Sequence, residues 1–437
     1  MKMWKVATGV SVVAIVVAVG IVADVFPAEI APIDQIDPAQ VSDDLVEQGE
    51  NMAMLGDCAA CHTQKGQSDL SGGVALPTPF GTIYSTNITP DRETGIGTWS
   101  FEAFDRAMRD GIDRRGVHLY PAFPYDHFAA MTDADMRALY AYLMVQDPVA
   151  APAVPNQLSF PFNFRPLLAG WKLLFHHPTP FAPDPAMDDE QNRGKYLAET
   201  IGHCTACHSP RNALGAVQQT AFLQGAEVEG WLAPPLGAAS IAPIGWTLDD
   251  YADYLFDGWS ETHSIAAGPM TNVVDHLYMA QEDDVYAIAA WLAQITPRQD
   301  EAERTARVAE IDARNLPETF DFTLAGLDAP QPVRDGALIF QTNCVKCHKE
   351  RIADTQPVSL GLTYAVNAPA PTNLFRVVIG GIEPPQGSSS RRMQPITLSA
   401  GDLAKVAAFV RWQFTDLPEW PDLQKAAEAS LSDQTAH

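Results

Sequence analysis

The sequence predicts a mainly α-helical protein built from three similar helical units in tandem, with loop-rich connections between them. Three observations support this fold class. One five-residue string with two cysteines and a histidine occurs three times in 437 residues. A glycine opens a helical stretch before each copy, and a pattern of apolar residues with helical period follows each copy. Runs that alternate between apolar and polar residues, as half-buried strands do, are scarce.

All six cysteines of the chain lie in the three strings, which are Cys58-Ala-Ala-Cys61-His62, Cys204-Thr-Ala-Cys207-His208 and Cys344-Val-Lys-Cys347-His348. This pattern is the signature for attachment of a c-type haem. The two thiols can each form a thioether to the porphyrin, while the adjacent imidazole reaches the iron. We therefore expect three covalently bound haems c, with His62, His208 and His348 as the proximal iron ligands.

Other uses of paired cysteines fit the strings less well. A zinc site needs a second pair of ligands at suitable spacing, and a redox dithiol needs no histidine directly after it. Six cysteines are also too few to form a disulfide framework in a chain of 437 residues, which is long enough to build its own core.

The strings begin 146 and 140 residues apart, at positions 58, 204 and 344. A chain of this length suggests about three domains, so one haem per domain is the simple division. The predicted order is a signal or membrane anchor (1–30), a first cytochrome c domain (40–148), an apolar connector (149–183), a second domain (184–297), a linker (298–329) and a third domain (330–425).

The amino terminus predicts export. Two lysines, Lys2 and Lys5, precede an uncharged apolar run over residues 6–23. At helical rise this run spans most of a bilayer core, and lysines before it suit the cytoplasmic side. We favour an uncleaved anchor over a cleaved signal peptide that would leave a chain starting near Asp24. Both alternatives place the rest of the chain at the periplasmic side of the inner membrane.

The formal net charge of the chain is −26. Because phosphate binding requires a basic face, we expect no nucleic-acid partner. The acidity is sufficiently explained by solubility outside the cytoplasm.

The helices that follow the strings share a pattern. An acidic residue is followed seven positions later, two helical turns on, by an aromatic residue on the same face. The glycines that precede the strings are Gly49, Gly194 and Gly336, and the acid and aromatic pairs are Asp135 and Tyr142, Asp284 and Trp291, and Asp402 and Phe409. We expect the two helices of each unit to cross and form the haem pocket. In this respect all three units resemble class I cytochrome c domains.

The connections differ in character. The middle of the first connector, residues 160–177, is unusually apolar for a linker. It can be buried between domains, dock on a dehydrogenase subunit, or lie at the bilayer surface near quinone. The second linker begins with a charged stretch over residues 298–315 that predicts a helix packed across domains or facing solvent.

Motifs around the strings resemble the three-haem cytochrome c subunits of bacterial membrane-bound dehydrogenases. These are Asn87-Ile88-Thr89-Pro90-Asp91, Leu119-Tyr120-Pro121-Ala122-Phe123-Pro124-Tyr125, Gly268-Pro269-Met270 and Ala370-Pro371-Thr372-Asn373-Leu374. The resemblance covers about residues 45–425. It implies a non-catalytic subunit that carries electrons from a periplasmic catalytic subunit to ubiquinone in the membrane.

The connector and the segment Phe414-Thr415-Asp416-Leu417-Pro418-Glu419-Trp420 look closer to cytochromes that accompany molybdenum-dependent aldehyde or N-heterocycle dehydrogenases. An iron–sulfur subunit is then a further candidate partner. The alternative is the cytochrome subunit of a quinoprotein or flavoprotein alcohol or sugar dehydrogenase. Two other classes stay open, namely a haem enzyme or sensor with an open sixth site and a free-standing electron shuttle.

The sixth iron ligands are predicted from their place before the last helix of each unit. Met270 and Met393 suit the second and third haems, with Met279 competing weakly with Met270. For the first haem, many relatives carry methionine where this chain has Phe123, which cannot bind iron. We favour His127 as its replacement, and Met131 is the alternative.

Overall fold

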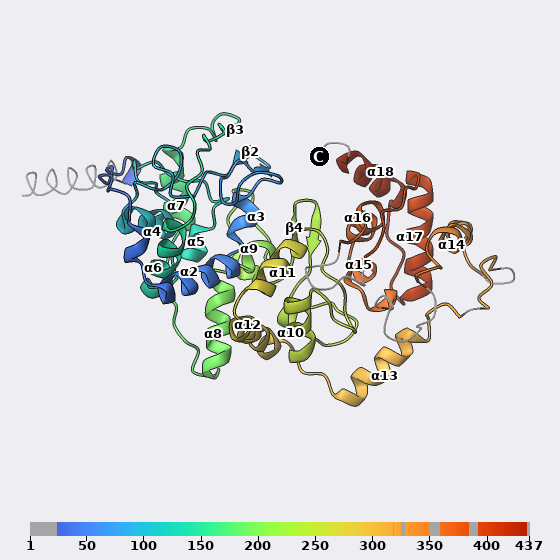
Figure 1. Cartoon of the computed structure of the whole chain (residues 1–437). Coiled ribbons are helices and arrows are strands. Elements are labelled where there is room, and N and C mark those ends of the chain that lie inside the picture. The colour runs from blue at the N-terminus through green and yellow to red at the C-terminus, as the bar shows by residue number, and fades with distance from the viewer. Residues whose placement is uncertain (1–23, 318, 325–327, 349–358, 384–391, 435–437) are drawn as a thin grey trace, which may run out of the picture. The chain divides into compact units, whose positions relative to one another are not determined.

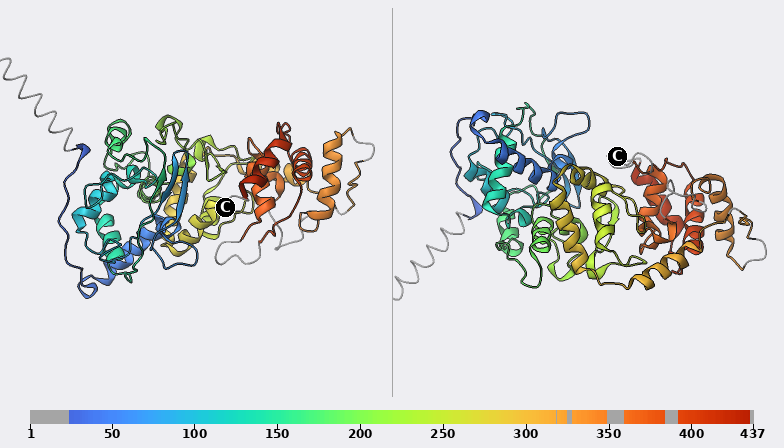
Figure 2. Two further views of the ribbon diagram at one scale, coloured as in Figure 1. Left: turned by 90° about the horizontal axis from the view of Figure 1, so that it is seen from above. Right: turned by 60° about the horizontal axis from the view of Figure 1, so that its bottom comes forward.

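The computed structural model describes residues 24–317, 319–324, 328–348, 359–383 and 392–434 (Figures 1 and 2). The predicted anchor at residues 6–23 lies outside this range. Within the described residues, no helix is both long enough and apolar enough to cross a bilayer. Contacts divide the chain into two compact units. Unit 1 extends to Pro183 and includes Glu199–His203 and Ala213–Ala216, and unit 2 holds the remainder.

Unit 1 contains the first string and the connector. Its helical elements are η1 (Pro38–Gln40), α2 (Asp43–Leu55), α3 (Cys58–His62), α4 (Phe101–Asp110), α5 (Tyr125–Phe128), α6 (Asp133–Met144) and α7 (Leu167–Phe175). A loop motif ties the first residue of the connector to the middle of the predicted first domain. The buried Asn87 donates from Nδ2 to the carbonyl of Val149 at 2.7 Å, and its Oδ1 accepts from Thr89.

Unit 2 contains the second and third strings. Its helical elements are α8 (Asp189–Glu199), α9 (Thr205–His208), η2 (Gln219–Ala221), η3 (Gly237–Ala239), α10 (Leu248–Asp257), α11 (Pro269–Met279), α12 (Glu282–Ile295), α13 (Glu301–Asp312), α14 (Gln331–Asn343), η4 (Leu360–Leu362), α15 (Tyr364–Asn367), α16 (Thr372–Gly380), α17 (Ala400–Phe414) and α18 (Leu423–Gln434). The charged stretch after the second domain is helical as predicted, as α13. Arg304 of α13 pairs with the buried Asp250 of α10.

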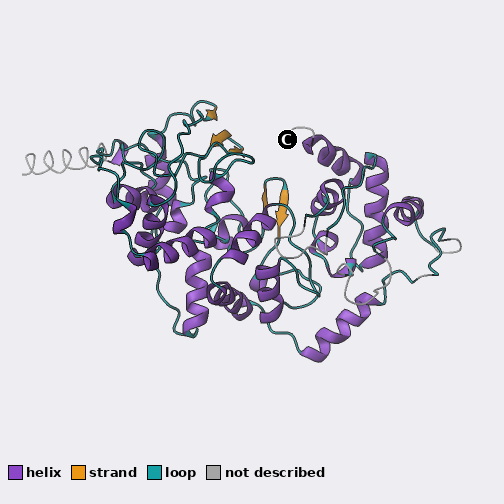
Figure 3. Ribbon diagram, viewed as in Figure 1, coloured by secondary structure: helices purple, strands orange, loops and turns teal. Residues whose placement is uncertain are grey.

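Among the residues that the structure describes, which are mainly helical, strands form two small sheets (Figure 3). The first sheet has the order β1 (Ala75–Thr78), β2 (Gly81–Tyr84), β3 (Gln157–Leu158), and both of its pairings are antiparallel. The second is a hairpin of β4 (Ala226–Val228) and β5 (Trp231–Ala233). Each lies shortly after a haem-attachment string, and both matter for the histidines of those strings.

The sequence suggested that a glycine opens the helix before each string, and this prediction is wrong. These glycines, Gly49, Gly194 and Gly336, lie inside α2, α8 and α14. A Cβ at these positions would meet backbone carbonyl oxygens of the crossing helix, Ala138 O at 1.9 Å, Ala287 O at 1.8 Å and Lys405 O at 2.0 Å. Only glycine allows such an approach, and this offsets its low helix propensity. The predicted crossing of two helices is therefore present at all three strings.

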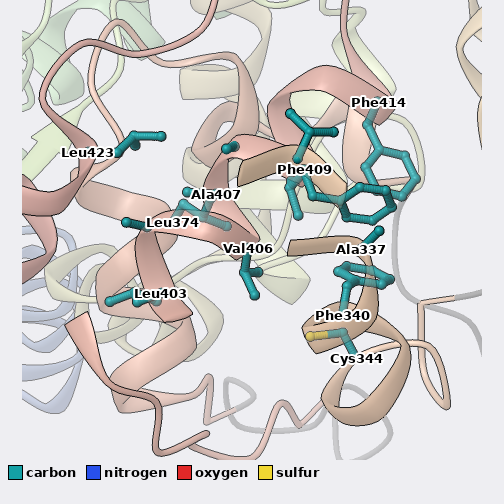
Figure 4. Packing of buried hydrophobic residues seen from close by; sticks show 14 of the residues in the cluster. Ala337, Phe340, Cys344, Leu374, Leu403, Val406, Ala407, Phe409, Phe414 and Leu423 are labelled. Atoms are coloured by element: carbon teal, nitrogen blue, oxygen red, sulfur yellow. The ribbon is translucent and has the colours of Figure 1, made fainter. Parts of the chain in front are cut away.

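The crossing of α14 and α17 forms a hydrophobic core of its own (Figure 4). The fully buried Phe409, the aromatic residue predicted to face the crossing, lies 5.3 Å from Phe340 between ring centroids. Cys344 lies at the edge of the same cluster, close to Phe340. The third string is therefore attached directly to the packed core of its region.

Candidate haem attachment sites

Each string is wound into a helical turn that places its histidine one turn after its first cysteine. In the second string, the His208 N–H donates to the Cys204 carbonyl at 2.9 Å, and in the third the His348 N–H donates to Cys344 at the same distance. The first string forms α3 over its full length. This winding brings both thiols and the imidazole of a string to neighbouring positions on one short turn.

The backbone directly before the third string differs from that before the first and second strings. Asp57 before Cys58 and His203 before Cys204 both adopt positive φ, 48° and 36°. This left-handed conformation is uncommon for residues other than glycine, and it breaks the preceding helix so that the string starts a new turn. In the third string, α14 ends at Asn343 and Cys344 follows it directly.

None of the six cysteines, all of which lie in the described part of the chain, forms a disulfide. Cys344 is buried, Cys58, Cys204 and Cys207 are half-buried, and Cys61 and Cys347 are exposed. Burial raises the pKa of Cys58 to about 12, with a further contribution from Asp57, and burial also raises the pKa of Cys344 to about 12. The thiols of Cys58 and Cys344 are therefore neutral in the polypeptide alone.

Backbone carbonyls orient two of the histidines. The Nδ1 of His62 lies 2.6 Å from the Thr86 carbonyl oxygen, and the Nδ1 of His208 lies 2.7 Å from that of Pro234. A carbonyl only accepts, so Nδ1 carries the proton in both rings and Nε2 has the lone pair. This is the tautomer in which ligating histidines are usually held.

Burial keeps the three histidines neutral. It lowers the pKa of His62 and His208, although their carbonyl partners act in the opposite direction, and it lowers the pKa of His348 to about 4. Neutral imidazole is the form that binds iron. Thiols outside any disulfide beside neutral imidazoles, two of which carry their proton on Nδ1, therefore fit a covalently attached haem.

The two candidates for the sixth ligand of the first haem, His127 and Met131, are both buried, with exposed fractions of 8% and 3%. The His127 Nδ1 lies 3.0 Å from the Asp126 carboxylate, and its ring packs 6.5 Å from that of His203 between centroids. Phe123, at the position of the missing methionine, packs on Phe128. A carboxylate on Nδ1 is a common support for a histidine that binds metal through Nε2.

In unit 2 the methionine candidates separate by position. Met270 is half-buried at the start of α11, whereas Met279, at the other end of this helix, is 49% exposed. Met393 is half-buried against the core of α14 and α17 and forms an isolated bridge with Ile382. The exposure of Met279 favours Met270.

Sequence reasoning missed several residues around these sites. His203, directly before Cys204, packs on His127 and Phe128, and its only sequence signal is its place next to a cysteine. The carbonyls of Thr86 and Pro234 carry no residue-type signal, because any residue can supply one. Helix α11 was also missed.

Each Cys-x-x-Cys-His string follows a helix that crosses a second helix closely at a glycine. This arrangement is that of a c-type cytochrome. The family model for cytochrome c matches residues 46–146 and 333–413. This class of protein holds haem c covalently and transfers electrons.

Comparison with known proteins identifies the group more narrowly. The chain is 35% identical to the gluconate 2-dehydrogenase cytochrome c subunit of Pantoea cypripedii over 85% of this chain and 86% of that protein. It is 42% identical to a nicotinate dehydrogenase subunit of Pseudomonas putida over 96% of its length, and 38% identical to the fructose dehydrogenase cytochrome subunit of Gluconobacter japonicus over 71%. The chain spans 35% and 65% of the lengths of these two relatives. It belongs to the family of dehydrogenase cytochrome c subunits.

Proposed function

We propose that the chain passes electrons through three covalent haems c from a periplasmic catalytic subunit to ubiquinone. One observation carries this proposal. The Cys-x-x-Cys-His string occurs three times in one chain, each time after a helix that crosses another helix at a glycine. Each haem supplies one-electron chemistry, and two haems beyond the first extend the reach of the chain. His62, His208 and His348 would bind the irons on one side.

Placement and burial support the proposed ligands on the opposite side of each iron. Met270 and Met393 would bind the second and third irons, and a thioether there favours the reduced state. For the first iron, His127 is supported by its pair with Asp126, and the buried Met131 is the alternative. If these residues bind the irons, no sixth position stays open, as a haem enzyme or sensor would require.

The catalytic partner is proposed to be a molybdenum-dependent dehydrogenase of the aldehyde or N-heterocycle type, with an iron–sulfur subunit. The relative named for nicotinate dehydrogenase supports an N-heterocycle partner. The second candidate is a quinoprotein or flavoprotein dehydrogenase, which the relatives named for fructose, gluconate and alcohol dehydrogenases favour.

The proposal places the chain at the periplasmic face of the inner membrane. The connector carries exposed apolar side chains, among them Phe160 at 83% and Leu173 at 76%. Apolar residues in such a cluster suit the lipid boundary.

His118 joins this connector to the amino-terminal segment. Its Nε2 lies 3.3 Å from the Val25 carbonyl oxygen, and its Nδ1 lies 3.1 Å from the Lys172 Nζ of α7. Its own carbonyl accepts from Arg165 at 2.7 Å. Val25, two positions after the apolar run, is thus linked through His118 to α7. If the apolar run is a membrane anchor, the apolar side chains of α7 would lie close to the bilayer.

The test is isolation of the full chain from membranes in mild detergent. We expect a catalytic dehydrogenase subunit to co-purify and the complex to reduce a quinone analogue with the substrate of that subunit. The cofactor of the co-purified subunit distinguishes the molybdenum partner from the quinoprotein or flavoprotein partner. Recovery of the chain alone from the soluble fraction, without quinone reduction, would contradict the proposal.

A further inference from the structure

The histidines of the first and second strings depend on short strands for their orientation. Thr86, the acceptor for His62, follows β2 by two positions, and Pro234, the acceptor for His208, directly follows β5. A change in the position of either strand therefore moves the carbonyl that holds the imidazole. What fixes these strands in place determines the hydrogen bond on Nδ1.

In unit 1, an asparagine side chain holds the strand. The Asn156 Oδ1 accepts from the backbone N–H of Tyr84 at 2.9 Å, and Tyr84 lies two positions before Thr86. Asn156 directly precedes β3, which covers the same edge of β2. The support of the first histidine therefore comes from the connector.

In unit 2, an asparagine holds the equivalent point from a different region of the chain. The Asn373 Oδ1 accepts from the Leu232 N–H at 2.8 Å, and its Nδ2 donates to the Leu232 carbonyl at 2.9 Å. Leu232 again lies two positions before the acceptor carbonyl, that of Pro234. Asn373 belongs to α16, in the region of the third string, 141 residues away.

A second contact supports this docking. The Arg376 guanidinium, one turn after Asn373 on α16, lies 5.9 Å from the centre of the Trp231 ring. Gly230, in the turn between β4 and β5, has a φ of 73°, which favours glycine. A Cβ there would also lie 2.1 Å from the Arg376 Nη2, so a larger residue would displace this guanidinium. The Trp231 ring also packs closely on Gly268, next to Met270.

We propose that Asn373 of the third region is a positioning residue for His208, equivalent to Asn156 for His62, and so couples the third region to the second haem. This inference rests on the proposed function, since it requires haem at both strings. Asn373 touches neither the imidazole nor the haem. It acts by fixing the edge of β5, whose unpaired N–H and C=O groups are otherwise open to solvent.

The electronic consequence has a defined sign. An imidazole that donates from Nδ1 to a carbonyl is a more basic ligand at Nε2. It stabilises the oxidised iron and lowers the reduction potential. Loss of the asparagine loosens the strand, weakens this hydrogen bond and raises the potential of the haem concerned, with the haem still attached.

The experiment compares three alanine variants of the full-length chain, Asn373→Ala, Asn156→Ala and Asn367→Ala. Asn367 is the matched control, because its side chain binds Gly361 and Thr363 within the third region and does not contact β5. Haem content per chain is measured first. Spectroelectrochemical titration then resolves the separate reduction steps, and low-temperature electron paramagnetic resonance records the ligand field of each oxidised haem.

We expect unchanged haem content in all three variants. Asn373→Ala should move one reduction step to higher potential, Asn156→Ala should move a different step in the same direction, and Asn367→Ala should move neither. If Asn373→Ala does not accumulate, Asn373→Ser removes both bonds while it keeps a polar side chain. The inference is overturned if neither Asn373 variant moves a step, or if the Asn373 and Asn156 variants move the same one. Absence of haem from the unaltered chain would instead refute the proposed function.

Discussion

The helix crossings next to the three strings are alike, whereas the residues predicted to be the sixth iron ligands differ from site to site. At each crossing, a Cβ on the glycine would lie between 1.8 and 2.0 Å from a backbone carbonyl oxygen of the other helix. Among the predicted sixth ligands, the first site offers a buried histidine and a buried methionine, and the second offers one half-buried and one exposed methionine. The chain thus keeps one architecture for haem attachment while the ligand that sets the potential can vary between sites.

The largest effect is expected at a crossing. Gly194→Ala places a Cβ 1.8 Å from the Ala287 carbonyl oxygen, so α8 and α12 must separate. Overpacking of this kind typically costs about 1–3 kcal/mol of unfolding free energy. Denaturant unfolding of the haem-loaded chain measures the loss.

The control is Gly170→Ala in the middle of α7, where a Cβ meets open space. There, helix propensity predicts a gain of about 0.5–1 kcal/mol. Equal destabilisation by the two substitutions would show that the crossing does not require glycine.

The second site provides the next effect. Met270→Ala should remove one thioether-to-iron signature from the absorption spectrum and lower the potential of that haem, because a thioether favours the reduced iron. Met279→Ala, at the exposed end of the same helix, should leave the spectrum unchanged. A reversal of these two outcomes would assign the ligand to Met279.

The smallest effect is expected where two candidates compete. His127→Ala should alter the electron paramagnetic resonance signal of the first haem, and Met131→Ala should leave this signal in place. Ligation by two imidazoles should give this haem a lower potential than a histidine and methionine pair would, since imidazole stabilises the oxidised iron better. If only Met131→Ala disturbs the first haem, the assignment of His127 is wrong.

Much of the helical framework could be predicted, because its signals are local. The acid and aromatic spacing marked α6, α12 and α17, and the charged linker marked α13. The strands β1 to β5 were missed because they are two to four residues long, too short for an alternating pattern. The sequence predicted the wrong role for the crossing glycines. Their role is to allow two helices to approach closely, and this depends on how both helices pack.

At the candidate sites too, the sequence predicted the residues of the local motif but not their distant partners. Cys-x-x-Cys-His is contiguous, so its chemistry can be predicted from residue order alone. The partners of the histidines cannot, because Thr86 and Pro234 act through their backbone carbonyls, and Asn373 reaches β5 from 141 residues away. Burial separated Met270 from Met279, and it left His127 and Met131 equal.

The central claim is that one chain holds three haems, one on each string. The most direct measurement is a pyridine haemochrome assay on the purified full-length chain, combined with haem staining after denaturing electrophoresis. We predict three haems per chain, all of which stay with the denatured polypeptide. A stoichiometry of one or two, or haem that dissociates on denaturation, would contradict the account.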